Sequence, residues 1–255
     1  MDLEGLVNRL LDKGVSKEEI IKRLSLEIET FKDIDSKKLA ESVLSEVMTT
    51  RLDIKDSELH DLLEVPLASA TMHDLGVGCR GDGDFFVHRM IADLASGTHE
   101  PRLKTALTPL EQDDAGAVEI GDGKIVVAAV DGTHSRLSDF PFIAGFHVAR
   151  AAMRDVMVKG AKPVALIDDL HLSDDGDVGK LFDFVAGIAA VAELSGVPLI
   201  AGSTLRTGGD MVIGTRMVSG VGCIGVAEKL LRRKDVRTGD SILMTSGAGG
   251  GTIAT

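Results

Sequence analysis

The sequence has few aromatic residues, few cysteines and no excess of positive charge. Aromatic side chains make up only 3% of the 255 residues, and tryptophan and tyrosine are absent. The core must therefore be built from aliphatic and alanine side chains. The formal net charge is -12. It argues against nucleic acid as a partner, because nucleic-acid binding depends on neutralising phosphates with lysine and arginine.

Cysteine is equally sparse. Cys79 and Cys223 lie far apart in the chain, which fits neither a zinc-type spacing nor a disulfide framework. The first residues lack the basic and apolar regions of a signal peptide, and no apolar run reaches the length that spans a membrane. Hydrophobic residues still make up 44% of the chain. The composition therefore predicts a globular cytoplasmic protein with no membrane partner.

Residues 1–64 predict a small helical segment. Apolar residues recur at helical spacing in three stretches, of which the first stops at Gly14 and the third runs from about Ser36 to Arg51. The second begins at Ser16 and Glu19, which match a capping box. Nothing in this segment carries chemistry, so we expect it to pack or to bind a partner.

Beyond Pro66 the pattern changes to glycine-rich loops, strands and alanine-rich helices. Gly116–Ile120 and Ile125–Val130 predict a β-hairpin around a Gly-Asp-Gly turn. Helices are expected at about 144–159 and 178–194. Because strands and helices interleave without regular alternation, we predict an α+β fold rather than a doubly wound parallel sheet.

The end of the chain predicts the beginning of a further domain. A strand at Ser241–Thr245 opens into a run of glycines, which is how a new unit commonly starts. We therefore expect a domain over residues 65–235, followed by residues 236–255 as the start of a second one. On this interpretation the chain is a fragment or a truncated form of a longer polypeptide.

Two acidic clusters flank the predicted hairpin. Asp113 and Asp114 precede its first strand, whereas Asp131 ends its second strand and is followed by Gly132 and Thr133. Carboxylates beside small residues are hard oxygen ligands with open space, which suits Mg²⁺ bound to a polyphosphate. A solvated acidic turn is the alternative for the first cluster, and an Asx-type turn is the alternative for the second.

Asp155 lies in a helix rich in alanine and methionine. It can pair with Arg154, or with Lys159 at i+4, as a surface ion pair of small energetic value. Alternatively, it faces a cation site. His134 is a weak site candidate because of its neighbours alone.

The glycine loop 76–83 precedes a predicted helix from Asp84 to about Ala95. Backbone N–H groups in such a loop can wrap a phosphate, and glycines allow it to order on binding. The alternative is a disordered linker. In the helix, we expect four apolar side chains to face inward: Phe85, Val87, Ile91 and Leu94.

The order of these motifs resembles the aminoimidazole ribonucleotide (AIR) synthetase superfamily, which includes the hydrogenase-maturation dehydratase and thiamine-monophosphate kinase. The shared pattern consists of Asp113-Asp114-Ala, Asp131-Gly-Thr after a strand, Arg154-Asp155 before Gly160-Ala-Lys-Pro163, Gly202-Ser203-Thr204, and Arg237-Thr-Gly239-Asp240. It spans about residue 72 to the end. With its helical extension, the chain is similar to archaeal AIR synthase-related proteins.

This resemblance implies an AIR synthase N-terminal-like domain whose sheet pairs across a homodimer and which binds ATP and Mg²⁺. Carried over by position, Asp113, Asp114, Asp131 and Asp155 would hold the metal, with Asp131 and Asp155 as the candidate catalytic residues. The nucleotide would be held by Gly76, Gly78, Arg80, Gly81, Gly132, Thr133, Gly202, Ser203 and Thr204.

Two positions depart from the family pattern. Arg154 stands where the family usually has Asn, and Ser203 stands where it has Asp or Glu. The second change removes an anionic ligand and should weaken Mg²⁺ binding. Val77, at the position expected to be reactive in selenophosphate synthetases, disfavours selenium chemistry.

The resulting expectation is an ATP- and Mg²⁺-dependent enzyme that transfers phosphoryl to an oxygen acceptor on a small molecule or a modified protein group. The alternative is a nucleotide-binding maturation or accessory protein with reduced catalysis, favoured by Arg154 and Ser203. A metabolite-binding domain unrelated to ATP is the third possibility. The sequence does not name the acceptor.

Overall fold

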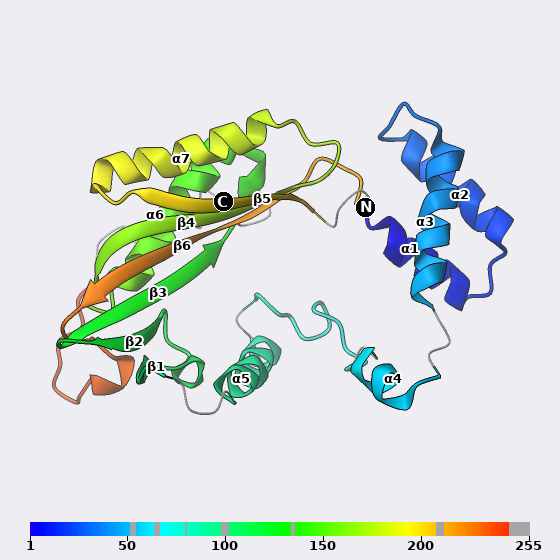
Figure 1. Cartoon of the computed structure of the whole chain (residues 1–255). Coiled ribbons are helices and arrows are strands. Elements are labelled where there is room, and N and C mark those ends of the chain that lie inside the picture. Colours follow the sequence, from blue (N-terminus) through cyan, green and yellow to red (C-terminus); the bar gives the residue numbers. More distant parts are fainter. Residues whose placement is uncertain are drawn as a thin grey trace. The chain divides into compact units, whose positions relative to one another are not determined.

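The computed structural model describes residues 1–51, 55–63, 67–79, 81–97, 102–133, 136–207 and 212–244, and Figure 1 shows its elements. The chain forms two compact units. Unit 1 consists of Met1–Ala70, His171–Val178 and Leu205–Met217, and unit 2 consists of Thr71–Leu170, Gly179–Thr204 and Val218–Thr255. The predicted boundary near residue 64 stays a prediction, because residues 64–66 lie outside the described ranges.

Unit 1 is built on the predicted helices. They are α1 (Leu3–Asp12), α2 (Lys17–Glu29) and α3 (Ser36–Thr50), followed by the short α4 (Ser57–Leu63). Asp2, Ser16 and Asp35 cap the first three, each accepting a backbone N–H three residues ahead. Such caps satisfy donors that have no partner within the helix. The starts of these helices are therefore determined locally.

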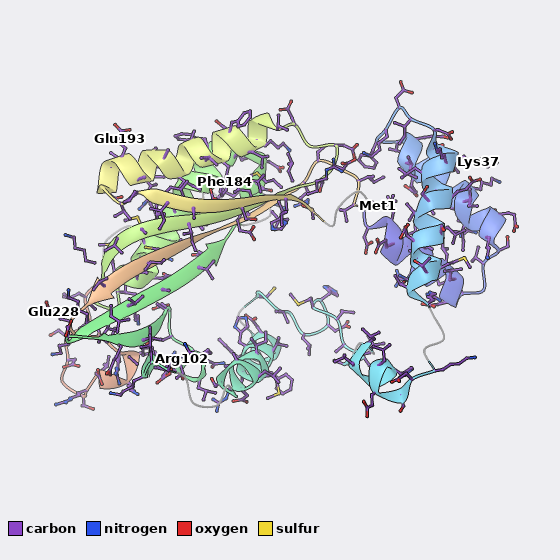
Figure 2. All side chains as sticks on the ribbon, viewed as in Figure 1. Met1, Lys37, Arg102, Phe184, Glu193 and Glu228 are labelled. Carbon is purple, nitrogen blue, oxygen red and sulfur yellow. The ribbon has the colours of Figure 1, made fainter. Side chains whose placement is uncertain are left out.

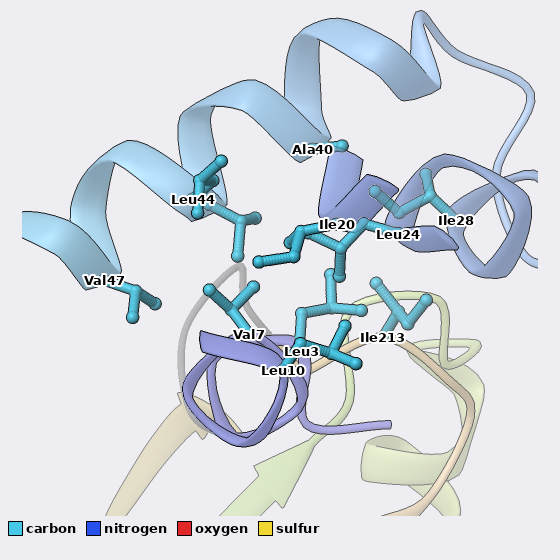
Figure 3. Close-up of a cluster of buried hydrophobic side chains, with 11 residues drawn as sticks. Leu3, Val7, Leu10, Ile20, Leu24, Ile28, Ala40, Leu44, Val47 and Ile213 are labelled. Atoms are coloured by element: carbon cyan, nitrogen blue, oxygen red, sulfur yellow. The ribbon is translucent and has the colours of Figure 1, made fainter. Parts of the chain in front are cut away.

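Apolar side chains from the three helices form one buried cluster (Figure 3). Its members are Leu3, Val7, Leu10, Ile20, Leu24, Ile28, Ala40, Val43, Leu44, Val47 and Ile213. Burying one large aliphatic side chain stabilises a fold by about 1.5–3 kcal/mol. Ile213 comes from the distant segment 205–217, so the helices share their core with a part of the chain that sequence periodicity does not connect to them.

A buried ion pair adds a second link within unit 1. The ammonium of Lys32 contacts the carboxylates of Asp174 and Asp175, and its distance to Asp175 Oδ1 is 2.9 Å. All three side chains are largely buried. Asp175 also accepts the backbone N–H of Gly214 at 2.8 Å. This network binds the segments 171–178 and 205–217 to the helices.

The six strands within the described residues form one sheet in the order β1-β2-β3-β6-β4-β5. Their bounds are β1 (Thr105–Leu107), β2 (Gly116–Gly121), β3 (Lys124–Gly132), β4 (Lys162–Leu172), β5 (Leu199–Arg206) and β6 (Met217–Ala227). The remaining helices are α5 (Asp82–Ser96), α6 (Pro141–Met157) and α7 (Gly179–Ser195). The predicted α+β fold is confirmed.

The predicted hairpin of β2 and β3 is also confirmed. The two strands pair antiparallel, with Ala117 opposite Val127. Gly121, Asp122 and Gly123 all have positive φ angles, a conformation that glycine adopts without strain and aspartate tolerates better than most residues. β3 then pairs antiparallel with β6, from Ile125 opposite Ala227 to Gly132 opposite Gly220.

Two expectations about apolar segments are wrong. Residues 241–244 form no strand and are exposed, while Thr245 lies outside the described residues. In α5, Phe85, Ile91 and Leu94 are exposed, whereas Asp84 and Ala92 are the buried positions. In both segments the apolar pattern exists, but most of its side chains stay uncovered within the described chain.

The two faces of the sheet differ. On one face, Val127, Val221 and Cys223 are fully buried, and a Cβ at Gly225 would lie 2.4 Å from Val156 of α6. Side chains alternate between faces along a strand, so Val130 lies on the opposite face and is 78% exposed. Helices therefore cover one face, while the other presents apolar side chains.

The helices α6 and α7 pack through facing glycines. A Cβ at Gly145 would lie 2.0 Å from the carbonyl oxygen of Phe184, and a Cβ at Gly187 would lie 2.1 Å from that of Phe142. Real side chains do not approach backbone so closely. Because glycine has no side chain, the two backbones pack directly against each other at these positions.

We predict that Gly145→Ala lowers the free energy of unfolding. Alanine is favoured over glycine in a helix by roughly 1 kcal/mol, but the overlap with Phe184 forces the helices apart, and overpacking typically costs about 1–3 kcal/mol. Urea denaturation measures the net loss. Glu193→Ala on the exposed side of α7 (Figure 2) serves as the control and should change little. A Gly145→Ala variant at least as stable as wild type would contradict the close helix contact.

Candidate acidic site

Asp131 lies near the end of β3, on the face that the helices cover. It stands opposite the buried Val221 of β6 in the strand register. Its Oδ1 accepts the backbone N–H of Gly132 at 3.0 Å. The side chain is thus held locally at the strand end, as the carboxylate–glycine sequence predicts.

Asp155 lies on α6, where the charges of Asp131 and Asp114 act on its carboxylate. Burial has the largest effect on the pKa of Asp155 and raises it, whereas the positive charge of Arg154 lowers it. The negative charges of Asp131 and Asp114 raise the pKa of Asp155 further. Two of the other carboxylates predicted as metal ligands therefore lie within electrostatic range of Asp155.

Asp113 is held differently. It forms an ion pair with Lys159, and both side chains are only 6% exposed. Burial alone would raise the pKa of Asp113, but the hydrogen bond and charge of Lys159 outweigh it, so the pKa of Asp113 lies below its ordinary value. Asp114, by contrast, is 61% exposed, and its Oδ2 lies 3.6 Å from the Lys159 ammonium.

Asp155 pairs with Arg154 and not with Lys159, because α6 ends before Lys159. Its carboxylate contacts the neighbouring Arg154 at 3.2 Å. Lys159, the alternative partner at i+4, lies beyond the last helical residue, Met157, so helical spacing no longer applies to it. Its ammonium turns to Asp113 and Asp114 instead. Lys159 is the residue that sequence reasoning missed here, because its partners lie about 45 residues earlier in the chain.

A second group of basic residues borders Asp113. Arg233 donates from Nη2 to the carbonyl oxygen of Glu111 at 2.7 Å, and Lys234 lies 3.6 Å from the Glu111 carboxylate. Together with Leu107 and Arg232, these residues and Asp113 line a cavity of about 40 Å³. Cationic side chains beside the carboxylates were not predicted from the sequence, since they lie more than 100 residues further on.

Thr133 and Gly132 lie where β3 meets the start of β6. The backbone N–H of Thr133 donates to the carbonyl oxygen of Ser219 at 2.8 Å, and its hydroxyl donates to the same oxygen at 3.0 Å. These bonds fix the strand end beside Asp131. His134 lies outside the described residues.

The glycine loop before α5 has defined turns. Gly76 and Gly78 have positive φ angles, and the backbone N–H of Gly78 donates to the buried Asp84 at 3.0 Å. Gly81 precedes α5 as its N-terminal cap residue, and Arg80 lies outside the described residues. His88 and Ile91 of α5 line a cavity of about 240 Å³ together with Asp113, so the helix that follows the loop borders the acidic site.

Gly202, Ser203 and Thr204 lie on β5, at the edge of the sheet. β6 and β4 separate β5 from β3, and three strand spacings amount to roughly 14 Å. Within one chain, these residues are therefore apart from Asp131. Gly202 instead lies against Asp168 of β4, because a Cβ at Gly202 would be 1.9 Å from Asp168 Oδ1. Burial, and then the charge of Asp169, raise the pKa of Asp168.

Within the described residues, no group of three or more histidine, cysteine or acidic side chains is arranged as a ready metal cage. Mg²⁺ does not require such a cage, because it commonly binds one or two carboxylates together with water and substrate phosphates. The acidic side chains of the described residues therefore do not fit a metal held by protein atoms alone.

The acidic residues and most of the sheet lie in a segment that matches a known protein family. Residues 112–227 match the family model of the AIR synthase related protein, N-terminal domain. This segment contains Asp113, Asp114, Asp131, Asp155 and the strands β2 to β6. Residues 112–227 thus carry an AIR synthase-related N-terminal domain, which confirms the resemblance seen in the sequence.

Two individual proteins are similar to this chain over different lengths. An uncharacterized protein of Methanocaldococcus jannaschii is 55% identical over 266 residues, covering 100% of this chain and 57% of its own length. The phosphoribosylformylglycinamidine synthase subunit PurL of Metallosphaera sedula is 31% identical over 118 residues, which are 46% of this chain and 16% of that protein. The chain thus spans little more than half of the first relative and a small part of the second.

Among solved structures, the protein tt0281 from Thermus thermophilus has a TM-score of 0.46 at 28% identity, covering 56% of this chain and 45% of that one. Thiamine monophosphate kinase from Aquifex aeolicus has a TM-score of 0.44 at 14% identity, covering 62% and 48%. Both TM-scores are below 0.5, so neither likeness bears on the function of this chain. No helix in the described part of the chain is long and apolar enough to cross a membrane.

We predict that the two thiols differ in reactivity. Cys79, in the glycine loop, is exposed, whereas Cys223 is buried on β6, where burial raises its pKa to about 11. At pH 8 little of Cys223 is then thiolate, the nucleophilic form. An Ellman titration should detect one thiol in the native protein and two after denaturation. Cys79→Ser should abolish the native signal. Two equally fast native thiols would contradict the burial of Cys223.

Proposed function

We propose that this chain provides the ATP- and Mg²⁺-binding domain of a cytoplasmic phosphoryl-transfer enzyme that activates an oxygen acceptor on a small molecule or a modified protein group. The observation that carries the proposal is that Asp114 and Asp131 both lie within electrostatic range of Asp155 on α6. The AIR synthase-related N-terminal domain supports it, because the resemblance implies binding of Mg–ATP. The acceptor would be recognised by parts of the protein beyond this domain.

In this proposal the carboxylates provide positioning and charge. Asp131 and Asp155 hold the Mg²⁺, which neutralises the phosphates when it is bound. Phosphoryl transfer requires little covalent assistance from a protein, and its rate depends mainly on alignment and charge stabilisation. The hydrogen bond from the Gly132 N–H to Asp131 Oδ1 and the hydrogen bonds from Thr133 to the Ser219 carbonyl oxygen keep the strand end in place.

The proposal includes a homodimer. Val130, Val218 and Ile167 lie on the sheet face that no helix of the described residues covers, and all three are exposed in the single chain. A Cβ at Gly222, which stands opposite Val130, would lie 2.7 Å from Ile167, so these residues share one face. Pairing this face with a second copy would remove the apolar surface from water.

A second candidate is an accessory protein that binds nucleotide without turning it over. Arg154 pairs with Asp155 and offsets part of the charge that a metal would use. Ser203 provides no carboxylate. If Ser203→Asp gains no ATP turnover while nucleotide binding persists, the accessory role is favoured over the enzyme.

We expect Asp131→Asn to weaken binding of Mg–ATP. Loss of a charged ligand costs about 1.5–3 kcal/mol, which corresponds to a fall in affinity of roughly tenfold or more. Isothermal titration of the purified 255-residue chain measures it. Asp122→Asn, in the exposed turn at the other end of β3, removes the same charge and should leave the affinity unchanged. Equal affinity in wild type and both variants would refute the site, as would a folded wild type that binds no Mg–ATP.

The dimer has its own test. Val130→Asp places a charge in the centre of the exposed apolar face and should shift the chain from dimer to monomer in analytical ultracentrifugation, because an unpaired charge is costly to bury. Val130→Thr, of similar shape, should shift it much less. A wild-type chain that sediments as a monomer at high concentration would rule out this interface.

A further inference from the structure

A cavity of about 630 Å³ lies along the helices α6 and α7, which pack against each other (Figure 1). Both helices belong to unit 2, and the described carboxylates of the acidic site do not line the cavity. Small-molecule sites commonly enclose about 300–1,000 Å³ and are lined mainly by apolar side chains with a few polar groups. The cavity therefore has the size of a site for an organic molecule rather than for a single ion.

The walls of the cavity are apolar from the floor to the rim. Met153 of α6 and Val191 of α7 are buried and form the floor. Met157 and Leu194 also line the cavity but are 56% and 79% exposed, so they form the rim. A ligand with an apolar body would cover these side chains and remove their surface from water, which is favourable in proportion to the area buried.

The ionisable side chains of the cavity are all basic. Arg150, Arg154 and His147 line it. Within the described residues, no aspartate or glutamate does so, although the chain has 40 acidic residues and a net charge of -12. A cavity lined by this sign of charge attracts an anionic ligand and disfavours a cation.

The two arginines are held differently. Arg154 forms an ion pair with Asp155 at 3.2 Å, which offsets its charge. The guanidinium of Arg150 lies over the ring of Phe146, 5.7 Å from the ring centroid, a distance at which a cation and an aromatic ring attract each other. Within the part of the chain that the structure describes, Arg150 has no carboxylate partner. Its positive charge therefore suits a ligand head group with one negative charge.

We propose that the cavity along α6 and α7 binds a small organic monoanion, a carboxylate on an apolar body, and that Arg150 binds the carboxylate. A guanidinium can donate two parallel hydrogen bonds to a carboxylate, and the apolar body then lies on Met153, Val191 and Leu194. A nucleoside triphosphate does not suit this cavity, because it carries several charges and no comparable apolar body. The inference is independent of the proposed function, since neither ATP nor Mg²⁺ takes part in it.

A tryptophan at the rim tests where the ligand binds. The chain has no tryptophan, so Leu194→Trp provides a single indole whose fluorescence reports on the cavity. Titration with octanoate should change this fluorescence saturably. Phe182→Trp is the matched control, because Phe182 lies on the same helix, is exposed and does not line the cavity. Its fluorescence should stay unchanged. Equal responses at the two positions would show binding elsewhere and would overturn the proposal.

Calorimetric titration of the wild-type chain tests the head group. Octanoate should bind about tenfold or more tightly than 1-octanol, which has the same chain length without the charge. Arg150→Met should remove this preference, whereas Arg150→Lys, which keeps the charge but not the planar fork, should retain part of it. The control is Arg23→Met, which removes an exposed arginine of α2 and should change nothing. The proposal is wrong if neither octanoate nor 1-naphthoate binds saturably, or if 1-octanol binds as tightly as octanoate.

Sedimentation of the same variants tests the other occupant that the cavity could have, a second copy of the chain. Arg150→Met should sediment as wild type does, because a small ligand leaves the oligomeric state unchanged. If Arg150→Met instead loses a dimer that wild type forms, the cavity belongs to an interface between copies, and the small-molecule site is refuted.

Discussion

The close packing of α6 is the constraint on which the candidate site depends. Gly145 of α6 meets the backbone of α7, and Gly225 of β6 leaves room for Val156. This approach sets the depth at which α6 lies on the sheet, and it brings Asp155 within reach of the charge on Asp131.

Charge balance around the carboxylates follows from where α6 ends. Two residues beyond its last turn, Lys159 reaches the acidic residues before β2 and neutralises the more buried one. Arg154 partly offsets Asp155. The protein thus holds its own cations next to the acidic site. A bound metal would meet a smaller net negative charge than four free carboxylates would present, and would depend more on the phosphates that accompany it.

Much of the fold could be predicted because its signals are local. The helix caps at Asp2, Ser16 and Asp35 and the hairpin turn at Gly121–Gly123 depend on residues only a few positions apart. The apolar stripes of α5 and of residues 241–244 were misleading for the opposite reason. Periodicity indicates that a face is apolar, but it does not provide the surface that would cover it.

The candidate site, too, has some features that the sequence predicts and others that only the fold reveals. The order of the acidic motifs identified the family, since strand ends and glycines are visible in the sequence. The partner of Lys159, the neighbourhood of Gly202 and Asp168, and the entry of Ile213 into the helical core were not visible.

The sequence by itself therefore determined the helix caps, the hairpin, the α+β class and the family, because these follow from interactions over a few residues or from the order of short motifs. Only the tertiary structure decided which carboxylates are free, which are paired and which face of the sheet is open. Those outcomes depend on burial and on distances between residues about 45 to more than 100 positions apart, which the linear order does not specify.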